Sequence, residues 1–271
     1  GYARAEESEV TVRMGYASRL YRRDPAGPHA RDWILVTPDA TRERRGGGMF
    51  PVEGERWVVT LAGRNGDYAP TDEAGFLEFA RSLPSPDIYH LIRHSEPLSD
   101  IVQHRFPSSL RRHYETLRRF PERYLVMGDA VCSFNPIYGQ GMTSAALQAA
   151  ELDQLLGERG GTRGLHGIAQ PYFKRVAKVV DTPWWGAVGE DFRYPETEGP
   201  KAPGTDLINA YMVKVHRVSH HDRVVCAAFL KVMNLMEPPT SLFHPRILWR
   251  VWRGQSRQAG ARRSITPVLQ R

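Results

Sequence analysis

The sequence lacks any long apolar run. None of its 271 residues falls in an apolar stretch near the roughly 18 residues that a membrane-spanning helix needs. The first residues, GYARAEESEV, have neither the basic start nor the apolar stretch of a secretory signal peptide. We therefore expect a cytoplasmic protein, and the length is enough to bury one large hydrophobic core or two modest ones.

Cysteine is scarce as well. The two thiols, Cys132 and Cys226, are far apart in the sequence, and without a secretory signal we interpret both as reduced. No Cys/His spacing suggests a zinc site, so no metal is expected. A cluster in a later helix is the alternative, because residues four apart share a helix face, but we interpret it as a polar face. It comprises His216, His220, His221 and Asp222.

Acidic residues are absent from the end of the chain. The net charge is +7, and from Arg246 onward there are seven arginines and no Asp or Glu. We interpret this end as solvated, with peripheral contact to acidic lipid or to a protein partner as the alternative. Trp249 and Trp252 stand among these arginines; we expect them to pack onto the body of the protein, a membrane-interface helix being the alternative. No nucleic-acid recognition motif accompanies the charge, so no nucleic-acid partner is expected.

The front half has the pattern of an antiparallel sheet. Strands are predicted at 9–22, 31–37, 41–50 and 56–63, from apolar residues that alternate or run between short turns. Connections this short exclude parallel pairing. A helix is predicted directly after Asp72, which is a suitable N-cap, and another strand at 100–106.

The remainder of the chain is mostly helical in pattern. Residues 124–127, YLVM, are predicted to form a short strand buried on both faces. A helix is predicted from Gly141 to about residue 156, and further helices at 168–180, 205–219, 222–236 and 245–253.

The stretch GDAVCSFNPIYGQGMTSAAL at 128–147 carries the chemistry. Asp129 follows the predicted strand, where open α/β sheets bind ligands, and its carboxylate can accept hydrogen bonds from sugar-like hydroxyls. Pro136 fixes the backbone of the next loop, and Gly139 and Gly141 allow backbone to approach a flat ligand. The predicted helix start points free N–H groups and the positive end of its dipole at that ligand. This order of groups suits a flavin, which joins a polyol chain to a flat ring that gains negative charge on reduction.

The same stretch resembles the second flavin-binding motif of the FAD-dependent monooxygenases with the para-hydroxybenzoate hydroxylase fold. In that family the Gly-Asp acid binds the ribityl chain, the Pro and the Gly-x-Gly loop line the isoalloxazine ring, and the helix N-terminus faces N1 and the C2 carbonyl. The resemblance implies FAD as cofactor and NAD(P)H as electron donor. The cofactor-binding roles it implies fall on Gly128, Asp129, Pro136, Gly139, Gln140, Gly141 and Met142.

The resemblance extends to the front half, because members of this family carry an antiparallel sheet that forms the substrate cavity. The implied fold class is α+β with a partial FAD/NAD(P)-binding α/β fold. It comprises an antiparallel-sheet substrate domain at 1–120, the C-terminal part of the FAD-binding domain at 121–160 with one strand–loop–helix flavin motif, and a helical C-terminal region at 161–271.

Residues of the third predicted strand are the candidates for the substrate side. A triple glycine inside a sheet indicates close approach of a ligand or of another backbone, and a flexible bend is the alternative. The candidates are Gly47, Gly48, Met49 and Phe50.

The sequence also departs from the family. The Gly-x-Gly-x-x-Gly turn that holds the FAD pyrophosphate and the family's Asp-Gly motif are both missing. Because the chain begins with Gly1 where the sheet would begin, we expect an N-terminally truncated sequence that carries the ring half of the FAD site. Val131 and Cys132 stand where aromatic hydroxylases of this fold commonly have Ala-His. The Trp-x-Trp-x-Ile-Pro segment of flavin halogenases is not found, which argues against a halogenase.

The implied function is that of an FAD-dependent monooxygenase. It would hydroxylate or epoxidise an apolar or aromatic small molecule with O2 through the flavin C4a-hydroperoxide. Two alternatives stay open: a flavin-dependent double-bond reductase like the related prenyl reductases, and a non-catalytic remnant that no longer holds FAD. No catalytic acid, base or nucleophile is evident in the sequence, and this fold can work without one.

Overall fold

The computed structural model describes residues 1–27, 33–38, 42–160 and 165–263, with side chains described as far as residue 254. The chain forms two compact units. Unit 1 comprises Gly1–Ser8, Arg111–Phe192 and Lys201–Arg271, and unit 2 comprises Glu9–Leu110 and Arg193–Pro200. The three-domain division expected from the sequence stays a prediction.

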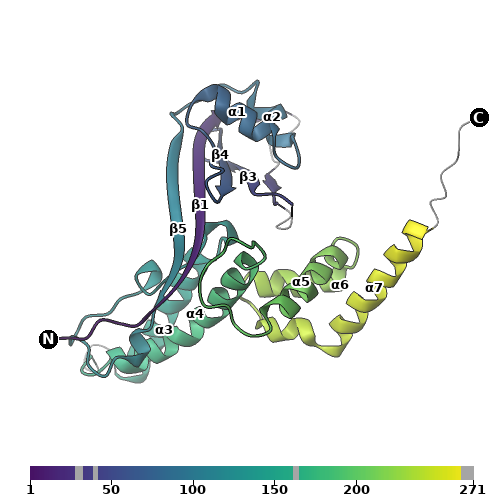
Figure 1. Cartoon of the computed structure of the whole chain (residues 1–271). Coiled ribbons are helices and arrows are strands. Elements are labelled where there is room, and N and C mark those ends of the chain that lie inside the picture. Colours follow the sequence, from purple (N-terminus) through teal and green to yellow (C-terminus); the bar gives the residue numbers. More distant parts are fainter. Residues whose placement is uncertain (28–32, 39–41, 161–164, 264–271) are drawn as a thin grey trace, which may run out of the picture. The chain divides into compact units, whose positions relative to one another are not determined.

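Unit 2 is built on an antiparallel sheet (Figure 1). The strands are β1 (Glu7–Arg22), β2 (Ile34–Val36), β3 (Arg45–Val52), β4 (Arg56–Arg64) and β5 (Val102–Arg112), in the order β2-β3-β4-β1-β5. The first four are the predicted strands, and their antiparallel pairing is confirmed. Residues 31, 32 and 41 of the predicted strands lie outside the described part of the chain. β5 runs further than the predicted 100–106.

Two helices cover one face of this sheet. α1 (Glu73–Arg81) begins after Asp72, whose carboxylate accepts a hydrogen bond from the Gly75 N–H at 2.8 Å, as expected of an N-cap. α2 (Asp87–Ile92) follows after a short turn. Their apolar faces close a core with strand residues that share one side of the pleat, namely Ala17, Tyr21, Val36, Met49, Trp57, Val59 and Leu61.

Unit 1 is mostly helical. Its long helices are α3 (Gly141–Glu158), α4 (Ala169–Asp191), α5 (Thr205–Ser219), α6 (Arg223–Met233) and α7 (Pro245–Arg263). Short 3₁₀ turns and one short strand connect them: η1 (Tyr114–Thr116), η2 (Gly128–Ala130), β6 (Cys132–Ser133), η3 (Pro136–Tyr138) and η5 (Pro239–Phe243). All five predicted helices are present, with α4 and α7 longer than expected.

The last three helices share a core of their own. It is formed by Val215 and Val218 of α5, Val225 and Val232 of α6, Leu242, and Ile247 and Val251 of α7. None of the helices in the described residues combines the length and the hydropathy needed to cross a bilayer.

The strand predicted at 124–127 is wrong. These residues are irregular, no described segment pairs with them, and Tyr124 and Met127 expose 56% and 38% of their surface. A strand needs a neighbour to satisfy its N–H and C=O groups. The apolar side chains YLVM predicted burial, but no strand in the described part of the chain lies beside them.

The N-cap of α1 gives a test of the unit 2 fold. Replacing Asp72 by Ala removes the acceptor for the Gly75 N–H and should lower the local stability of α1 by about 1 kcal/mol. Hydrogen exchange of the α1 amides should accelerate roughly fivefold, as mass spectrometry of peptides from this helix would measure. Thr71→Ala, one residue earlier and equally exposed, is the control and should leave exchange unchanged. Equal rates in the two variants would contradict the assignment of Asp72 as the cap.

Candidate functional site

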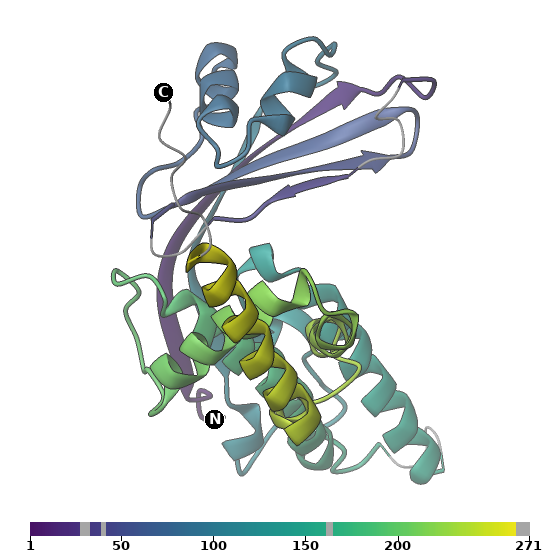
Figure 2. The ribbon, with the colours of Figure 1, turned by 90° about the vertical axis from the view of Figure 1, so that its right-hand side faces the viewer.

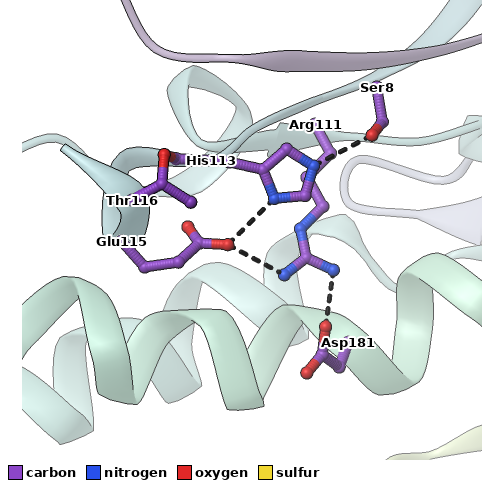
Figure 3. A network of polar contacts seen from close by, with 6 residues as sticks. All are labelled: Ser8, Arg111, His113, Glu115, Thr116 and Asp181. Atoms are coloured by element: carbon purple, nitrogen blue, oxygen red, sulfur yellow. Dashed lines mark hydrogen bonds and ion pairs between the residues drawn. The ribbon is translucent and has the colours of Figure 1, made fainter.

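A buried arginine joins the end of β5 to α4. Arg111 donates to Asp181 of α4 at 2.5 Å and to Glu115 of η1 at 3.4 Å, and only 6% of its side chain is exposed. His113 Nδ1 lies 2.9 Å from the same Glu115 oxygen, and His113 Nε2 lies 2.9 Å from the hydroxyl of Ser8 (Figure 3). A buried charge is tolerated when it is paired in this way. The network therefore ties the start of β1, the end of β5, η1 and α4 together within unit 1.

Three of these side chains form the Ser–His–carboxylate line that serine hydrolases use. This arrangement could not be predicted from the sequence, because Ser8 and His113 are 105 residues apart. The Glu115 oxygen that faces His113 also accepts a hydrogen bond from Arg111. The negative charge of Glu115 is therefore partly compensated by Arg111 and is less able to stabilise a protonated His113. We interpret the line as a structural tie.

The next residue of β5 positions the Gly-Asp turn. The Arg112 N–H donates to the Val131 carbonyl at 2.8 Å, and its guanidinium donates to the Ala130 carbonyl at 3.2 Å. Gly128 has φ of +63°, which favours glycine. The side chain of Asp129 is exposed and accepts no hydrogen bond from the described residues. Its carboxylate is therefore free to meet a ligand.

Helix α3 turns polar side chains inward. Gln148 is fully buried; it accepts a hydrogen bond from the Gly128 N–H at 2.8 Å and donates to the buried Ser144 hydroxyl at 3.2 Å. Met142 and Leu147 are instead exposed. The helix is thus docked to the Gly-Asp turn by hydrogen bonds, and polar Ser144 and Gln148 lie buried on it together with apolar Leu155.

A buried carboxylate at the end of α4 holds the loop that precedes α3. Asp191 is fully buried and accepts hydrogen bonds from the Asn135 amide at 3.1 Å and from the Tyr138 hydroxyl at 2.7 Å. Asn135 also accepts from the Ile137 N–H at 3.3 Å and so caps η3. Sequence reasoning missed Asp191, because 53 residues separate it from Tyr138 and nothing local links them.

The structure brings together the two halves of the sequence motif. Asp129 Oδ1 lies 4.0 Å from the position that a Cβ on Gly141 would take, so the acid stands beside the start of α3. Gly139 has φ of +67°, and no atom lies within 4 Å of the position of a Cβ there. Pro136 and Met142 are exposed on the same stretch. These residues form an open edge that a flat ligand could approach.

Gln140 has a different orientation from its neighbours. It is the N-cap residue of α3, yet its side chain makes no cap hydrogen bond. Its amide donates instead to the Met233 carbonyl at the end of α6, at 2.9 Å. In the described part of the chain the first N–H groups of α3 therefore have no side-chain cap, and the amide nitrogen of Gln140 is already bonded to α6.

The four substrate-side candidates lie in unit 2, on β3, and alternate between its faces. Gly47 and Met49 face the core beneath α1 and α2, where a Cβ on Gly47 would stand 3.1 Å from Leu61. Gly48 faces the other side, where the Phe50 ring covers it. Phe50 stacks on Trp33, with ring centroids 6.3 Å apart. The alternation of a strand therefore puts Gly48 and Phe50 on the open face, where Phe50 covers the buried Gly48 and is itself the exposed candidate for substrate contact. Trp33, which the sequence analysis did not single out, joins it.

Unit 2 also has an open pocket of about 500 Å³ at the start of β3. Two pairs of charges lie in its lining: Arg45 donates to both oxygens of Asp67 at 2.7 and 2.6 Å, and Arg44 pairs with Glu196. The hydrogen bonds to Asp67 raise the pKa of Arg45. Such a lining is unsuited to an apolar ligand. No group of three or more His, Cys, Asp or Glu in the described residues is placed to hold a metal ion.

Comparison with known proteins bears on this arrangement. No protein-family model matches the chain. Protein Rv3254 of Mycobacterium tuberculosis (strain ATCC 25618 / H37Rv) is 28% identical over 243 residues, which are 88% of this chain and 50% of the relative. The chain thus spans about half the length of the curated relative it matches.

Two solved structures are similar over nearly the whole chain. A flavoprotein/dehydrogenase from Cytophaga hutchinsonii matches with a TM-score of 0.62 over 92% of this chain and 56% of its own, at 10% identity. The flavin-dependent brominase Bmp2 matches with a TM-score of 0.58 over 95% of this chain and 58% of its own, at 10% identity. The chain has the fold of flavin-dependent enzymes. The predicted resemblance to flavoproteins is confirmed at the level of the fold, as is the α+β class.

Within this flavoprotein fold, Cys132 should be chemically inert. Burial raises the pKa of its thiol from 9.0 to about 12. The reactive thiolate should therefore be about a thousandfold rarer than for an ordinary thiol near neutral pH. With iodoacetamide at about pH 8.5, partly exposed Cys226 should be alkylated first and Cys132 only after unfolding, as peptide mass spectrometry would measure. Equal labelling of the two in the folded protein would contradict the burial of Cys132.

The hydrogen bond from Tyr138 to Asp191 gives a test of the loop. Tyr138→Phe removes the donor to a buried carboxylate and should lower stability by about 2 kcal/mol. Hydrogen exchange of peptides covering 134–141 should accelerate. Tyr124→Phe, at an exposed ring, is the matched control and should change neither quantity. A Tyr138→Phe protein with the exchange rate of the parent would show that Asp191 does not hold the loop.

Proposed function

We propose that unit 1 carries the ring side of an FAD site and that the chain works in an FAD-dependent monooxygenase. The observation that carries the proposal is the exposed carboxylate of Asp129 next to the start of α3, whose first N–H groups have no side-chain cap. The flavoprotein fold supports it. A bound flavin, reduced by NAD(P)H, would supply the electrons with which O2 is activated.

The residues present fit such a group. Asp129 would accept hydrogen bonds from the ribityl hydroxyls, as an unpaired exposed carboxylate can. Pro136 and Gly139 would lie against the ring, because no atom blocks the space over Gly139. The backbone N–H groups of Gly141 and Met142 would stabilise negative charge at the ring edge, helped by the dipole of α3. The buried side chains of Asn135 and Gln140 would keep this edge in place from behind.

We propose an apolar or aromatic small molecule as the substrate. Support comes from the face of the unit 2 sheet that α1 and α2 do not cover. Trp33, Leu35 and Phe50 are exposed there, and the hydroxyls of Ser18 and Thr60, 2.7 Å apart, add a polar point. Aromatic and aliphatic side chains with few polar groups are typical of small-molecule sites.

We further propose that the pyrophosphate of FAD is bound by polypeptide outside this sequence. Two observations support this. The chain covers only 50% of Protein Rv3254 and 58% of the brominase. Unit 1 also exposes apolar side chains next to the Gly-Asp turn and on α3, including Tyr124, Met127 and Leu147, which a further layer of structure would bury.

Flavin titrations test both proposals. The purified chain should bind riboflavin and FAD with dissociation constants that agree within roughly threefold, since it would contact only the part that the two share. Flavin fluorescence and the visible absorption bands would report binding. Much tighter binding of FAD would show that the chain also holds the pyrophosphate and would overturn the second proposal. Binding of neither would overturn the first for this chain and favour a non-catalytic remnant.

The role of Asp129 can be isolated by substitution. Asp129→Asn should weaken riboflavin binding about tenfold or more, because a hydrogen bond to a charged group contributes roughly 1.5–3 kcal/mol. Asp153→Asn, at an exposed acid on α3, is the matched control for net charge and should bind like the parent. If both variants bind equally well, Asp129 is not a ligand. Oxygenated product formed with NADPH consumption in the complete protein would separate a monooxygenase from a double-bond reductase.

A further inference from the structure

The first turns of α7 have two apolar faces. Ile247 and Val251 are buried in the core shared with α5 and α6. Leu248, Trp249 and Trp252 are exposed, with 50% of Trp249 and 69% of Trp252 accessible. Residues three and four apart neighbour each other on a helix, so these three side chains form one surface, here called the α7 tryptophan face.

The tryptophans do not pack as expected. The sequence analysis expected Trp249 and Trp252 to lie against the body of the protein, and their exposure corrects this. The ridge occupied by Ile247 and Val251 already fills that contact. Within unit 1, α7 lies at the end away from α3 and in front of the other helices in the second view (Figures 1 and 2). Large exposed apolar surface on a soluble domain commonly marks an interaction site.

Basic side chains border the α7 tryptophan face. Arg246 is exposed, and the Arg253 guanidinium lies 5.0 Å from the centre of the Trp249 ring. Arg250 is neutralised by Asp222 at 2.8 Å. In the sequence the imbalance continues, with seven arginines and no acid from residue 246 to the end. A partner for this surface must therefore be apolar and negatively charged together.

We propose that α7 binds the surface of a membrane that contains anionic lipid. Trp249 and Trp252 would enter the boundary between headgroups and acyl chains, where tryptophan rings are favoured, and Leu248 would enter beside them. Arg246 and Arg253 would contact lipid phosphates. A second copy of the chain is a poorer occupant, because it would bring two arginine-rich helices together. The proposal does not depend on flavin binding.

Vesicle flotation tests the proposal. The purified chain should float with vesicles of phosphatidylcholine containing about 30% phosphatidylserine, and roughly 20-fold less with phosphatidylcholine alone, since each arginine near an anionic surface contributes appreciably. About 0.5 M NaCl should release most of the protein from the anionic vesicles. Equal flotation with both vesicle types, or with neither, would overturn the proposal.

Substitutions distinguish vesicle binding through the α7 tryptophan face from nonspecific adsorption of the protein. The pair Trp249→Ala and Trp252→Ala should lower flotation with anionic vesicles at least tenfold and should abolish the blue shift of tryptophan fluorescence on binding. Trp185→Ala is the matched control, because Trp185 is 51% exposed but lies on α4, and it should float like the parent. An equal loss in the control would overturn the assignment to α7. The proposal would also be overturned if the parent chain did not float and light scattering showed a dimer that the two α7 substitutions dissociate.

Discussion

The arrangement of unit 1 depends on two carboxylates of one helix. Asp181, near the middle of α4, pairs with buried Arg111 at the end of β5, and the following residue of β5 holds the carbonyl groups behind the Gly-Asp turn. Asp191, at the end of the same helix, holds the loop that leads into α3. Because both carboxylates belong to α4, the Gly-Asp turn and the loop that leads into α3 are held by the same helix.

Local signals accounted for most of the fold. Alternating apolar residues, short turns and the Asp72 cap predicted the four strands and α1, and α5 lies where a helix was predicted at roughly 205–219. Long-range relations could not be predicted in this way. The strand at 124–127 failed because a strand is defined by its neighbour. The sequence analysis missed Asp191, Arg111 and Trp33, because each contacts residues that are distant in sequence. Such contacts cannot be predicted from one sequence alone.

The residue types and spacing of the candidate site could be predicted from the sequence, but its geometry could be predicted only in part. The motif at 128–142 does bring Asp129 beside Gly141. The role of Gln140 could not be seen in advance, because its amide is committed to α6. On β3, four consecutive candidates could not all face one side, since a strand alternates; Gly47 and Met49 are core residues beneath α1 and α2. The orientation of each side chain could not be predicted from the sequence.

The hydrogen bond from the Gly128 N–H to Gln148 spans 20 residues of turn, loop and helix. Its acceptor is on a helix, where adding one residue rotates every later side chain by about 100°. One insertion or deletion in α3 before Gln148 would turn this amide away from the turn and bring an apolar neighbour, such as Leu147 or Ala149, into its place. The stretch should therefore accept many substitutions among exposed positions but hardly any change of length. In a collection of homologues it would evolve as a block of constant spacing between loops of variable length.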